Sequence, residues 1–358
     1  MKLRSEPRMP SLVFAFPGDI DTPTGGYGYD RRIVAGLRGL GWDVYLLGLG
    51  DGFPFPSPET LRTAERRLAE LPAGTLAVVD GLAFGVMAKA AQRLKDHLRL
   101  IALVHHPLCR ENGLSAEQAK ELLASETAAL KQVRHVIVTS PATAGQVTDH
   151  FGVAGEKITV ILPGTDRPEP FDRPVSDCVR LLSVGTVVPR KGYDLLFEAL
   201  SGLQEYNWLL DIVGGLEADP ACYAALQEQA ARLGLTGRVV FHGAVPSDRL
   251  PGFYREADIF VLASRYEGYG MAYTEALAHG LPVIGSGGGA VRETLPEAAA
   301  IYCGTEDVDA LEIALRRLIS DPGERLLFAR SAQSASAALP SWQDAAALFA
   351  KTLMETRA

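Results

Sequence analysis

Short apolar runs alternate with longer amphipathic stretches along the whole chain. Apolar runs bounded by polar or glycine-rich segments are typical of buried strands, and apolar positions that recur at helical spacing are typical of helices. This alternation predicts an α/β protein with doubly wound parallel sheets and crossover helices. Strands are expected at Leu12–Phe16, Asp43–Leu47, Leu76–Asp80, Leu100–Val104, His135–Thr139, Ile158–Leu162, Val179–Val184, Trp208–Val213, Val239–His242, Ile259–Leu262, Pro282–Gly285 and Ala300–Tyr302. Helices are expected at Tyr29–Leu40, Pro58–Leu71, Leu82–Lys95, Ala116–Gln132 and Ala142–His150, with the last ones beginning near Asp307.

A proline-rich segment from Pro163 to Pro174 interrupts this periodicity and is typical of a linker. A chain of 358 residues is long enough for two domains. We therefore expect Rossmann-like domains over residues 1–168 and 169–338, followed by a helical segment over residues 339–358. Because ligands of such sheets bind beyond the carboxyl ends of the strands, residues that directly follow a strand are the candidates for a site.

Composition and charge narrow the classes of partner. The net charge of −8 argues against nucleic-acid binding. The four cysteines lack the spacing of a zinc site, and we expect reduced thiols. No apolar segment follows the basic residues of Met1–Pro10 and no stretch reaches the length of a membrane span, so we expect a cytoplasmic protein without a secretory signal.

Basic residues gather on one expected helix of the first half and on and just after another. They are Arg62, Arg66 and Arg67, and Lys89, Arg93, Lys95 and Arg99. Solvated helix faces explain this pattern. The alternative is peripheral docking of the N-terminal domain on the anionic inner face of a membrane, which would give access to a lipid-linked acceptor.

Two glutamates with a seven-residue gap stand out in the second half. Glu267 is expected in the loop after the strand Ile259–Leu262, and Glu275 inside the next expected helix. At about 1.5 Å per residue their carboxylates lie on the order of 8–12 Å apart along the axis. This span matches two hydroxyl-bearing rings joined by a diphosphate. An ionised carboxylate accepts hydrogen bonds from vicinal hydroxyls, so the pair is suited to reading the two ends of a nucleotide sugar.

Two adjacent cations occupy the turn between the strand Val179–Val184 and the next helix. Arg190 can hold a phosphate with two parallel hydrogen bonds, and Lys191 adds a point charge. These cations are suited to the diphosphate in the middle of the same ligand.

These features together resemble the donor site of retaining glycosyltransferases of family 4. The residues that carry the resemblance are Val184-Gly185, Arg190-Lys191-Gly192, Phe241-His242-Gly243, the run from Glu267 to Glu275, and Gly280-Leu281-Pro282-Val283-Ile284. The resemblance is close from Leu181 to Glu293 and weaker over the rest of the chain. It implies the GT-B architecture, in which two Rossmann-like domains face each other across a cleft and a terminal helix crosses back to the first domain.

The resemblance also implies roles for the donor residues. Arg190 and Lys191 would hold the diphosphate, Glu267 hydroxyls of the donor sugar, and Glu275 the ribose hydroxyls. The base would be held largely by backbone near Gly243, which leaves uridine and guanosine hard to tell apart. The donor-binding residues expected on these grounds are Gly25, Gly26, Gly185, Arg190, Lys191, Ala244, Val245, Glu267, Gly268, Tyr269, Gly270, Met271 and Glu275.

The glycine-rich run Gly25-Gly26-Tyr27-Gly28 follows the first strand. It is not a dinucleotide fingerprint, because Arg31 takes the place of the third glycine. An ordinary tight loop before a helix is one interpretation. The resemblance favours another, in which the loop covers the donor diphosphate and Tyr27 lies beside the acceptor.

Three more polar residues end strands of the first half. His105 and His106 follow Leu100–Val104, and Asp80 ends Leu76–Asp80. A histidine at such a place is often structural, but the resemblance implies a contact between His105 and the donor sugar, and we count it as catalytic with Arg190, Lys191 and Glu267. His106 and Asp80 join Tyr27 as acceptor candidates, and Asp80 is equally suited to cap the following helix.

We therefore expect a retaining hexosyltransferase of glycan or glycolipid biosynthesis that moves a sugar from a UDP- or GDP-sugar to a hydroxyl of a small molecule, a glycan or a lipid-linked acceptor. No metal or other cofactor is expected, because two cations already stand at the diphosphate position. The alternatives are a phosphorylase or a sugar-nucleotide epimerase of the same fold, and a non-catalytic module that binds nucleotide sugars.

Overall fold

The computed structural model describes residues 10–111, 113–169, 171 and 177–356, and its contacts divide the chain into two compact units. Unit 1 comprises residues 1–164 and 341–358, and unit 2 comprises residues 165–340. The sequence analysis placed these borders at 168/169 and 338/339. Residues 1–9, on which the expectation of no secretory signal rests, and residues 170 and 172–174 of the expected linker lie outside the described residues.

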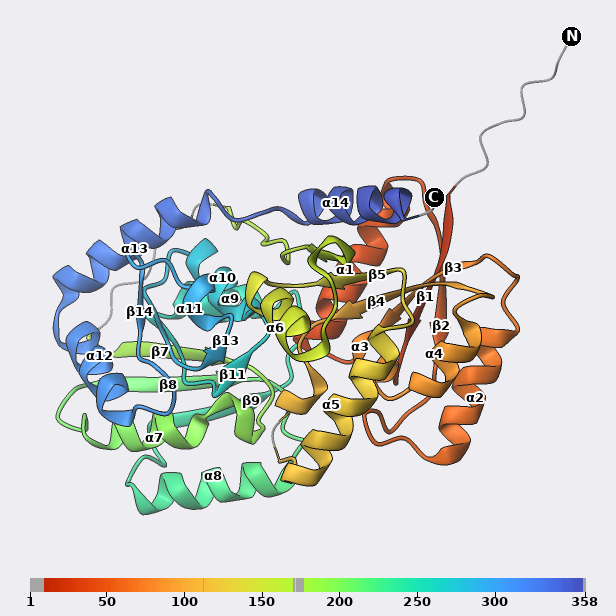
Figure 1. The fold of residues 1–358 in the computed structure, drawn as a ribbon. Helices are drawn as coiled ribbons and strands as arrows, with labels where there is room; N and C mark the ends of the chain where they lie inside the picture. The colour runs from red at the N-terminus through yellow and green to blue at the C-terminus, as the bar shows by residue number, and fades with distance from the viewer. Residues whose placement is uncertain (1–9, 112, 170, 172–176, 357–358) are drawn as a thin grey trace, which may run out of the picture. The chain divides into compact units, whose positions relative to one another are not determined.

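Unit 1 is a six-stranded parallel sheet between helices (Figure 1). Its strand order is β2-β1-β3-β4-β5-β6. The strands are β1 (Ser11–Phe16), β2 (Asp43–Gly48), β3 (Leu76–Asp80), β4 (Arg99–Val104), β5 (His135–Val138) and β6 (Ile158–Val160). The helices are α1 (Gly25–Gly39), α2 (Pro58–Ala69), α3 (Gly81–Phe84), α4 (Ala88–Leu94), η1 (Leu108–Arg110), α5 (Ala116–Leu130), α6 (Pro141–Phe151), η2 (Gly155–Lys157) and α14 (Trp342–Glu355).

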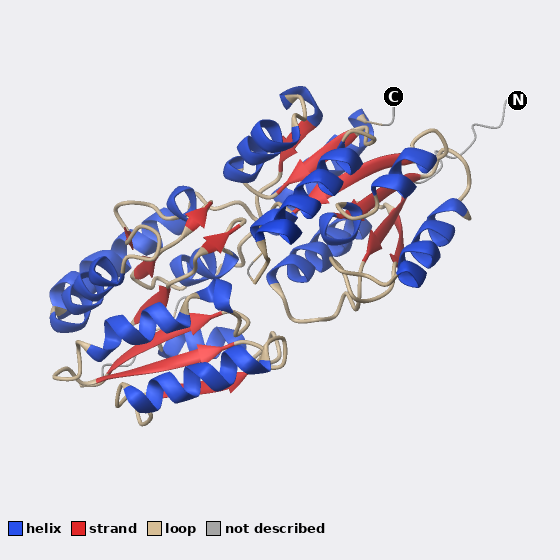
Figure 2. Cartoon of the chain, turned by 60° about the horizontal axis from the view of Figure 1, so that its bottom comes forward, coloured by secondary structure: helices blue, strands red, loops and turns tan. Residues whose placement is uncertain are grey.

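Unit 2 has a second six-stranded parallel sheet, with the order β14-β12-β10-β7-β8-β9. Its strands are β7 (Val179–Val184), β8 (Trp208–Val213), β9 (Val239–Gly243), β10 (Ile259–Leu262), β12 (Val283–Gly285) and β14 (Ala300–Tyr302), and β11 (Tyr266–Glu267) pairs separately with β13 (Gly288–Gly289). The helices are η3 (Pro189–Lys191), α7 (Tyr193–Ser201), α8 (Pro220–Arg232), α9 (Leu250–Glu256), α10 (Met271–Ala278), α11 (Val291–Thr294), α12 (Val308–Ser320) and α13 (Pro322–Ser336). Figure 2 shows the strands between helices in each unit.

The expected strands match those of both sheets closely, and two expected helices of unit 1 need correction. The first helix begins at Gly25 and not at Tyr29, because the Thr24 side chain accepts a hydrogen bond from the amide of Tyr27 and caps the helix earlier. The helix expected over Leu82–Lys95 is two helices, α3 and α4. Asp80 caps α3, which ends after one turn at Gly85, a residue of low helix propensity.

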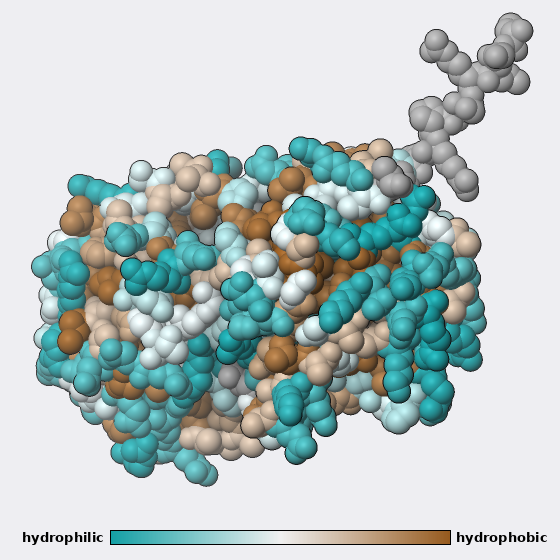
Figure 3. All heavy atoms as spheres, viewed as in Figure 1, coloured by the Kyte–Doolittle hydropathy of each residue, from teal (hydrophilic) through white to brown (hydrophobic). Residues whose placement is uncertain are grey.

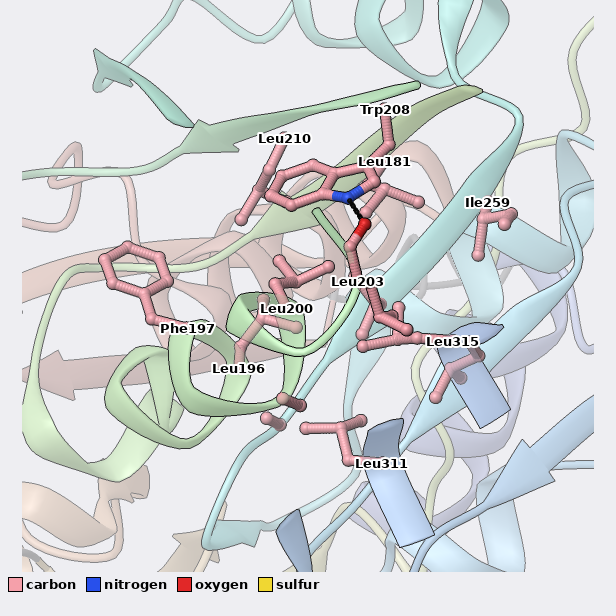
Figure 4. Packing of buried hydrophobic residues seen from close by; sticks show 14 of the residues in the cluster. Leu181, Leu196, Phe197, Leu200, Leu203, Trp208, Leu210, Ile259, Leu311 and Leu315 are labelled. Atoms are coloured by element: carbon pink, nitrogen blue, oxygen red, sulfur yellow. Dashed lines mark hydrogen bonds between the residues drawn. The ribbon is translucent and has the colours of Figure 1, made fainter. Parts of the chain in front are cut away.

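The central strands are apolar on both faces, as parallel sheets covered by helices require. In unit 2, Trp208 at the start of β8 is buried at 1% exposure and its indole N–H donates to the carbonyl oxygen of Leu203 at 2.8 Å. Figure 4 shows this bond amid leucines of α7 and α12. The indole therefore fills the space between sheet and helices without leaving its polar atom unpaired.

The terminal helix α14 packs on α1 within unit 1. The ring of Trp342 lies edge-on to that of Tyr29, with centroids 5.9 Å apart, and Arg32 stacks over the same indole. Among the described residues, no helix is long and apolar enough to cross a bilayer.

The strand orders identify a switch point in each sheet. In unit 1 the chain runs outward from β1 to β2 on one side and from β3 to β6 on the other. In unit 2 it runs from β7 to β9 on one side and from β10 to β14 on the other. Loops that leave adjacent strands in opposite directions open a crevice at the carboxyl ends, and this is where doubly wound sheets bind ligands.

Candidate functional site

The switch point of unit 2 holds three of the residues expected to be catalytic. Arg190 and Lys191 follow β7 in η3, and Glu267 follows β10 in the short strand β11. Nζ of Lys191 donates to Oε1 of Glu267 at 2.6 Å, and Nη1 of Arg190 lies 3.4 Å from Oε2. The hydroxyl of Ser264 donates to the same carboxylate at 2.6 Å. The structure therefore joins the two cations and the first glutamate into one cluster.

The cluster is held together by a tight backbone turn. Gly192, between η3 and α7, has a φ of +62°, and a Cβ at this position would collide with the backbone carbonyl of Ala263. Gly185 at the end of β7 leaves room for the side chain of Lys191, whose Cε lies 2.8 Å from an ideal Cβ there. Both glycines are needed for the cations to lie against the strand ends.

The cations keep Glu267 ionised. Burial of this carboxyl, which is 6% exposed, would raise its pKa, but the charges of Lys191 and Arg190 and hydrogen bonds from Lys191 and Ser264 lower the pKa to about 2. The three side chains carry two positive charges and one negative charge. A diphosphate that enters here meets a net positive site in which a carboxylate already occupies some of the donors.

Arg265 is a residue of this region that the sequence analysis did not identify. Its guanidinium makes two parallel bonds to Asp194, at 2.8 and 2.7 Å, and a third to the carbonyl oxygen of Pro189. Asp194 is the first carboxylate after Arg190 and Lys191 in the sequence, and it forms its ion pair with Arg265. The available signal was its position just after the buried strand β10, which is the same signal that identified Glu267.

Glu275 lies in α10 and is held from another helix. The hydroxyl of Tyr254, from α9, donates to Oε2 of Glu275 at 2.7 Å. Tyr254 is buried at 1% exposure and its ring stacks on that of His279 at 4.8 Å between centroids. Sequence reasoning missed Tyr254, because nothing in the local pattern shows which remote helix contacts a given side chain.

The remaining donor candidates of unit 2 also lie beyond the carboxyl ends of the strands. Ala244 and Val245 follow β9. Gly268, Tyr269 and Gly270 connect β11 to α10, which begins at Met271. Glu267 was expected in a loop, and instead it lies in β11, paired with Gly289 of β13.

Unit 1 contains a second polar cluster at its own switch point. Nε2 of His105, after β4, lies 3.1 Å from Oδ1 of Asp30 and 3.4 Å from Oδ2 of Asp80. Asp80 also caps α3 through the amide of Leu82 at 2.7 Å, as one interpretation of its sequence position predicted. Asp30, in α1, was not identified from the sequence, although a buried acidic residue on an otherwise apolar helix face was a readable signal.

The other candidates of unit 1 lie around this cluster. Gly25 and Gly26 are the first residues of α1 and not a loop, and an ideal Cβ on Gly26 would lie 3.5 Å from the His105 ring. The hydroxyl of Tyr27 donates to the carbonyl oxygen of Pro17 at 2.7 Å. His106 pairs with Glu111.

Ligand atoms of Asp30, Asp80 and His105 lie within 4.8 Å of one another, which is close enough to hold a metal ion. A hydrogen bond explains the same contacts: when Nε2 of His105 is protonated, its N–H can donate to the carboxylates of Asp30 and Asp80. Burial raises the pKa of Asp30. Burial alone would lower the pKa of His105, but the charge and hydrogen bond of Asp30, with those of Asp80, raise it above its usual value.

Comparison with known proteins agrees with this architecture. The sequence pattern of the family "Glycosyltransferase Family 4" matches residues 44–168, and that of "Glycosyl transferases group 1" matches residues 172–335. Mannosylfructose-phosphate synthase of Agrobacterium fabrum is 35% identical over 184 residues, which are 46% of this chain and 40% of that protein. The chain therefore aligns with less than half the length of that relative.

Solved structures match over nearly the whole chain. Sucrose-phosphate synthase from Thermosynechococcus elongatus aligns with a TM-score of 0.80 at 20% identity and covers 96% of this chain and 98% of its own. Anabaena HepE, in complex with UDP and glucose, aligns with a TM-score of 0.77 at 19% identity over 96% and 100%. At such identity the likeness shows the fold alone. The two family patterns show that the chain belongs to glycosyltransferase family 4, and the structural likeness confirms the GT-B fold.

Proposed function

We propose that this chain transfers a sugar from a UDP- or GDP-sugar to a hydroxyl acceptor, with retention of the anomeric configuration. The observation that carries this proposal is the cluster of Arg190, Lys191 and Glu267 at the switch point of unit 2. It offers hydrogen-bond donors with positive charge for a diphosphate and, directly beside them, a buried ionised carboxylate for sugar hydroxyls. Family membership and the UDP and glucose held by Anabaena HepE support the same ligand class.

In this proposal the leaving group is the nucleoside diphosphate. The bond between the anomeric carbon and the diphosphate oxygen breaks, and its electron pair remains on that oxygen. Arg190 and Lys191 stabilise the negative charge that develops there. The acceptor oxygen forms the new bond to the anomeric carbon, and its proton passes to the departing phosphate. Attack from the same face as departure accounts for retention without a covalent enzyme intermediate.

The other residues of unit 2 orient the donor. Glu267 accepts from hydroxyls of the sugar, and the amides from Gly268 to Met271 assist. Glu275 accepts from the ribose hydroxyls, and Tyr254 fixes its carboxylate. The backbone of Ala244 and Val245, beyond β9, holds the base. Such positioning of a donor lowers the entropy cost of reaching the transition state.

We propose that this transfer needs no divalent metal ion and no other cofactor. Two cations already stand where a metal would neutralise the diphosphate in other transferases, so a metal would be redundant there.

The acceptor is proposed only by chemical class, as a hydroxyl of a small molecule, a glycan or a lipid-linked sugar. The names of the matched relatives include synthases of sugar phosphates. Figure 3 shows hydrophilic residues over α2 and α4 in unit 1, the helices that contain Arg62, Arg66, Arg67, Lys89 and Arg93. Acidic neighbours pair with two of them, Arg66 with Glu70 and Arg93 with Glu65. This favours a solvated face in a cytoplasmic enzyme over membrane docking.

A test of the reaction class follows the release of nucleoside diphosphate. We expect release from the donor when a hydroxyl acceptor is present and little without it. A phosphorylase would instead need a glycoside and inorganic phosphate, and an epimerase would convert the nucleotide sugar without any acceptor. Release that is independent of the acceptor, or no turnover of any UDP- or GDP-sugar, would contradict the proposal.

A further inference from the structure

The cluster in unit 1 contains a buried aspartate to which the proposed mechanism gives no role. Asp30 is 0% exposed, and its Oδ1 accepts from Nε2 of His105 at 3.1 Å. Its second oxygen, Oδ2, is buried without a hydrogen-bond partner among the described residues. A buried carboxylate that pairs with an imidazole has little value for stability, because desolvation costs about as much as the pairing returns. A role in orienting His105 explains its presence.

The contacts of the His105 ring are one-sided. Both carboxylates, Asp30 and Asp80, lie at Nε2. The ring is fixed further by Tyr29, whose ring meets it edge-on with centroids 5.4 Å apart. The backbone of His105 is held by the hydroxyl of Thr139, which donates to its carbonyl oxygen at 3.2 Å. The side chain remains 19% exposed, so an outside group can reach it.

We propose that Asp30 is a positioning residue for His105. Together with Asp80 it holds the Nε2 side of the ring, so that the Nδ1–H is the atom left to donate a hydrogen bond to a substrate oxygen. The chemistry recognised is a hydroxyl, of either the donor sugar or the acceptor. This inference rests on the proposed function for its substrate, but the arrangement of the ring can be tested without turnover.

Electrostatics agree with this geometry. Two carboxylates at Nε2 favour the doubly protonated imidazole, which has a donor on each nitrogen. The other titratable groups that face the cluster from α1 are Tyr29 and Tyr27, and burial, the largest cause, raises the pKa of both phenols, so they stay neutral. Asp19 and Asp51 act on Tyr27 with the same sign of charge as Asp30 and Asp80. Asp30 and Asp80 are the charged groups that favour the cationic ring of His105.

The first experiment follows the ring nitrogens of His105 by ¹⁵N NMR between pH 6 and pH 9 in the full chain, with the signal assigned by a His105→Gln variant. We expect a doubly protonated ring in the wild-type protein at pH 8. In Asp30→Asn the midpoint of titration should fall by about one to three pH units. The matched control is Glu111→Gln, which removes the carboxylate partner of the neighbouring His106 and should leave the His105 signal unchanged.

A neutral His105 ring in the wild-type protein at pH 8 would overturn the proposal, and this measurement does not depend on the folding of an Asp30 variant. So would an unchanged titration in Asp30→Asn. Stoichiometric zinc or manganese in the purified protein, bound through His105, would also overturn it, since the ring nitrogen would then be a metal ligand.

The second experiment measures kcat and KM against pH for wild type and Asp30→Asn, with circular dichroism as the check on folding and Asp30→Ser as the second variant. As pH rises, Asp30→Asn should lose activity earlier than the wild-type protein. Relative to wild type, we expect its kcat to be less than about threefold lower at pH 6 and about tenfold or more lower at pH 9.

A rise in the KM of the donor would identify a donor hydroxyl as the partner, and a rise in the KM of the acceptor would identify an acceptor hydroxyl. An equal loss at every pH would contradict the role. No turnover by the wild-type protein would instead refute the proposed function and leave the NMR test standing.

Discussion

Nζ of Lys191 lies 2.6 Å from Oε1 of Glu267, so the cation proposed for the diphosphate is paired with the carboxylate proposed for the sugar. Arg190 shares the same carboxylate at 3.4 Å. A diphosphate must therefore compete with Glu267 for these donors when it binds. The pairing also lowers the pKa of Glu267, which explains why this buried carboxylate stays ionised.

Replacing Glu267 with glutamine should separate binding from turnover. Removal of the negative charge frees the donors of Lys191 and Arg190, so free nucleoside diphosphate should bind about three to ten times more tightly. Turnover should fall by about a hundredfold or more, because the sugar hydroxyls lose their charged acceptor. Calorimetric titration and initial rates measure the two effects. Glu306→Gln, which removes a carboxylate paired with Arg265, serves as control and should change neither.

Replacing either cation with alanine should impair turnover. Loss of a phosphate clamp in a preorganised site should cost about 2–4 kcal/mol of transition-state stabilisation, a factor of roughly 10²–10³ in rate. Initial rates of Arg190→Ala and Lys191→Ala test this, with the exposed Arg232→Ala as control. Rates within about threefold of wild type for both variants would show that another group stabilises the leaving diphosphate.

The hydroxyl of Tyr254 should act through Glu275. Tyr254→Phe keeps the stacking on His279 and removes only the bond of 2.7 Å to the carboxylate. We expect affinity for free nucleoside diphosphate and for intact donor to fall together, by about threefold to tenfold, because both contain ribose. Tyr273→Phe, which removes another buried phenol bonded to a backbone carbonyl, is the control for stability. A loss confined to the intact donor would show that Glu275 does not bind the ribose.

A buried carboxyl in α5 should make stability depend on pH. Glu126 is 1% exposed and accepts from the amide of Leu108 at 2.9 Å; burial raises its pKa to about 8. Between its unfolded pKa and about pH 8 the folded state binds the proton and the unfolded state does not, so stability falls as pH rises. The effect is on the order of 3 kcal/mol at neutral pH.

Glu126→Gln removes this titration. The Tm of Glu126→Gln minus the Tm of the wild-type protein should therefore increase from pH 5 to pH 8, as measured by thermal unfolding. Glu117→Gln, at an exposed position of the same helix, provides the comparison. A Tm difference for Glu126→Gln that is constant across this range would mean that the carboxyl is already ionised in the folded state.

The sequence was sufficient to predict both sheets, because buried parallel strands read as continuous apolar runs and strand ends indicate where ligands bind. Arg190, Lys191 and Glu267 were identified on these grounds. Their mutual ion pairs were not, since a contact across more than seventy residues depends on how the strands order themselves. The same holds for Tyr254, Asp30 and Arg265, whose partners come from other elements. The break between α3 and α4 was missed because Gly85 ends α3 after one turn inside an otherwise helical pattern.

The central claim is that the switch point of unit 2 binds a nucleoside diphosphate through its own cations. Calorimetric titration of UDP, GDP and ADP, and of their hexose conjugates, into the wild-type chain and into Lys191→Ala, all in excess EDTA, tests it most directly. The account predicts one site for UDP or GDP in the wild-type protein and an affinity at least about tenfold weaker in the variant. Equal affinity in the two proteins, or binding only after Mg²⁺ or Mn²⁺ is restored, would contradict it.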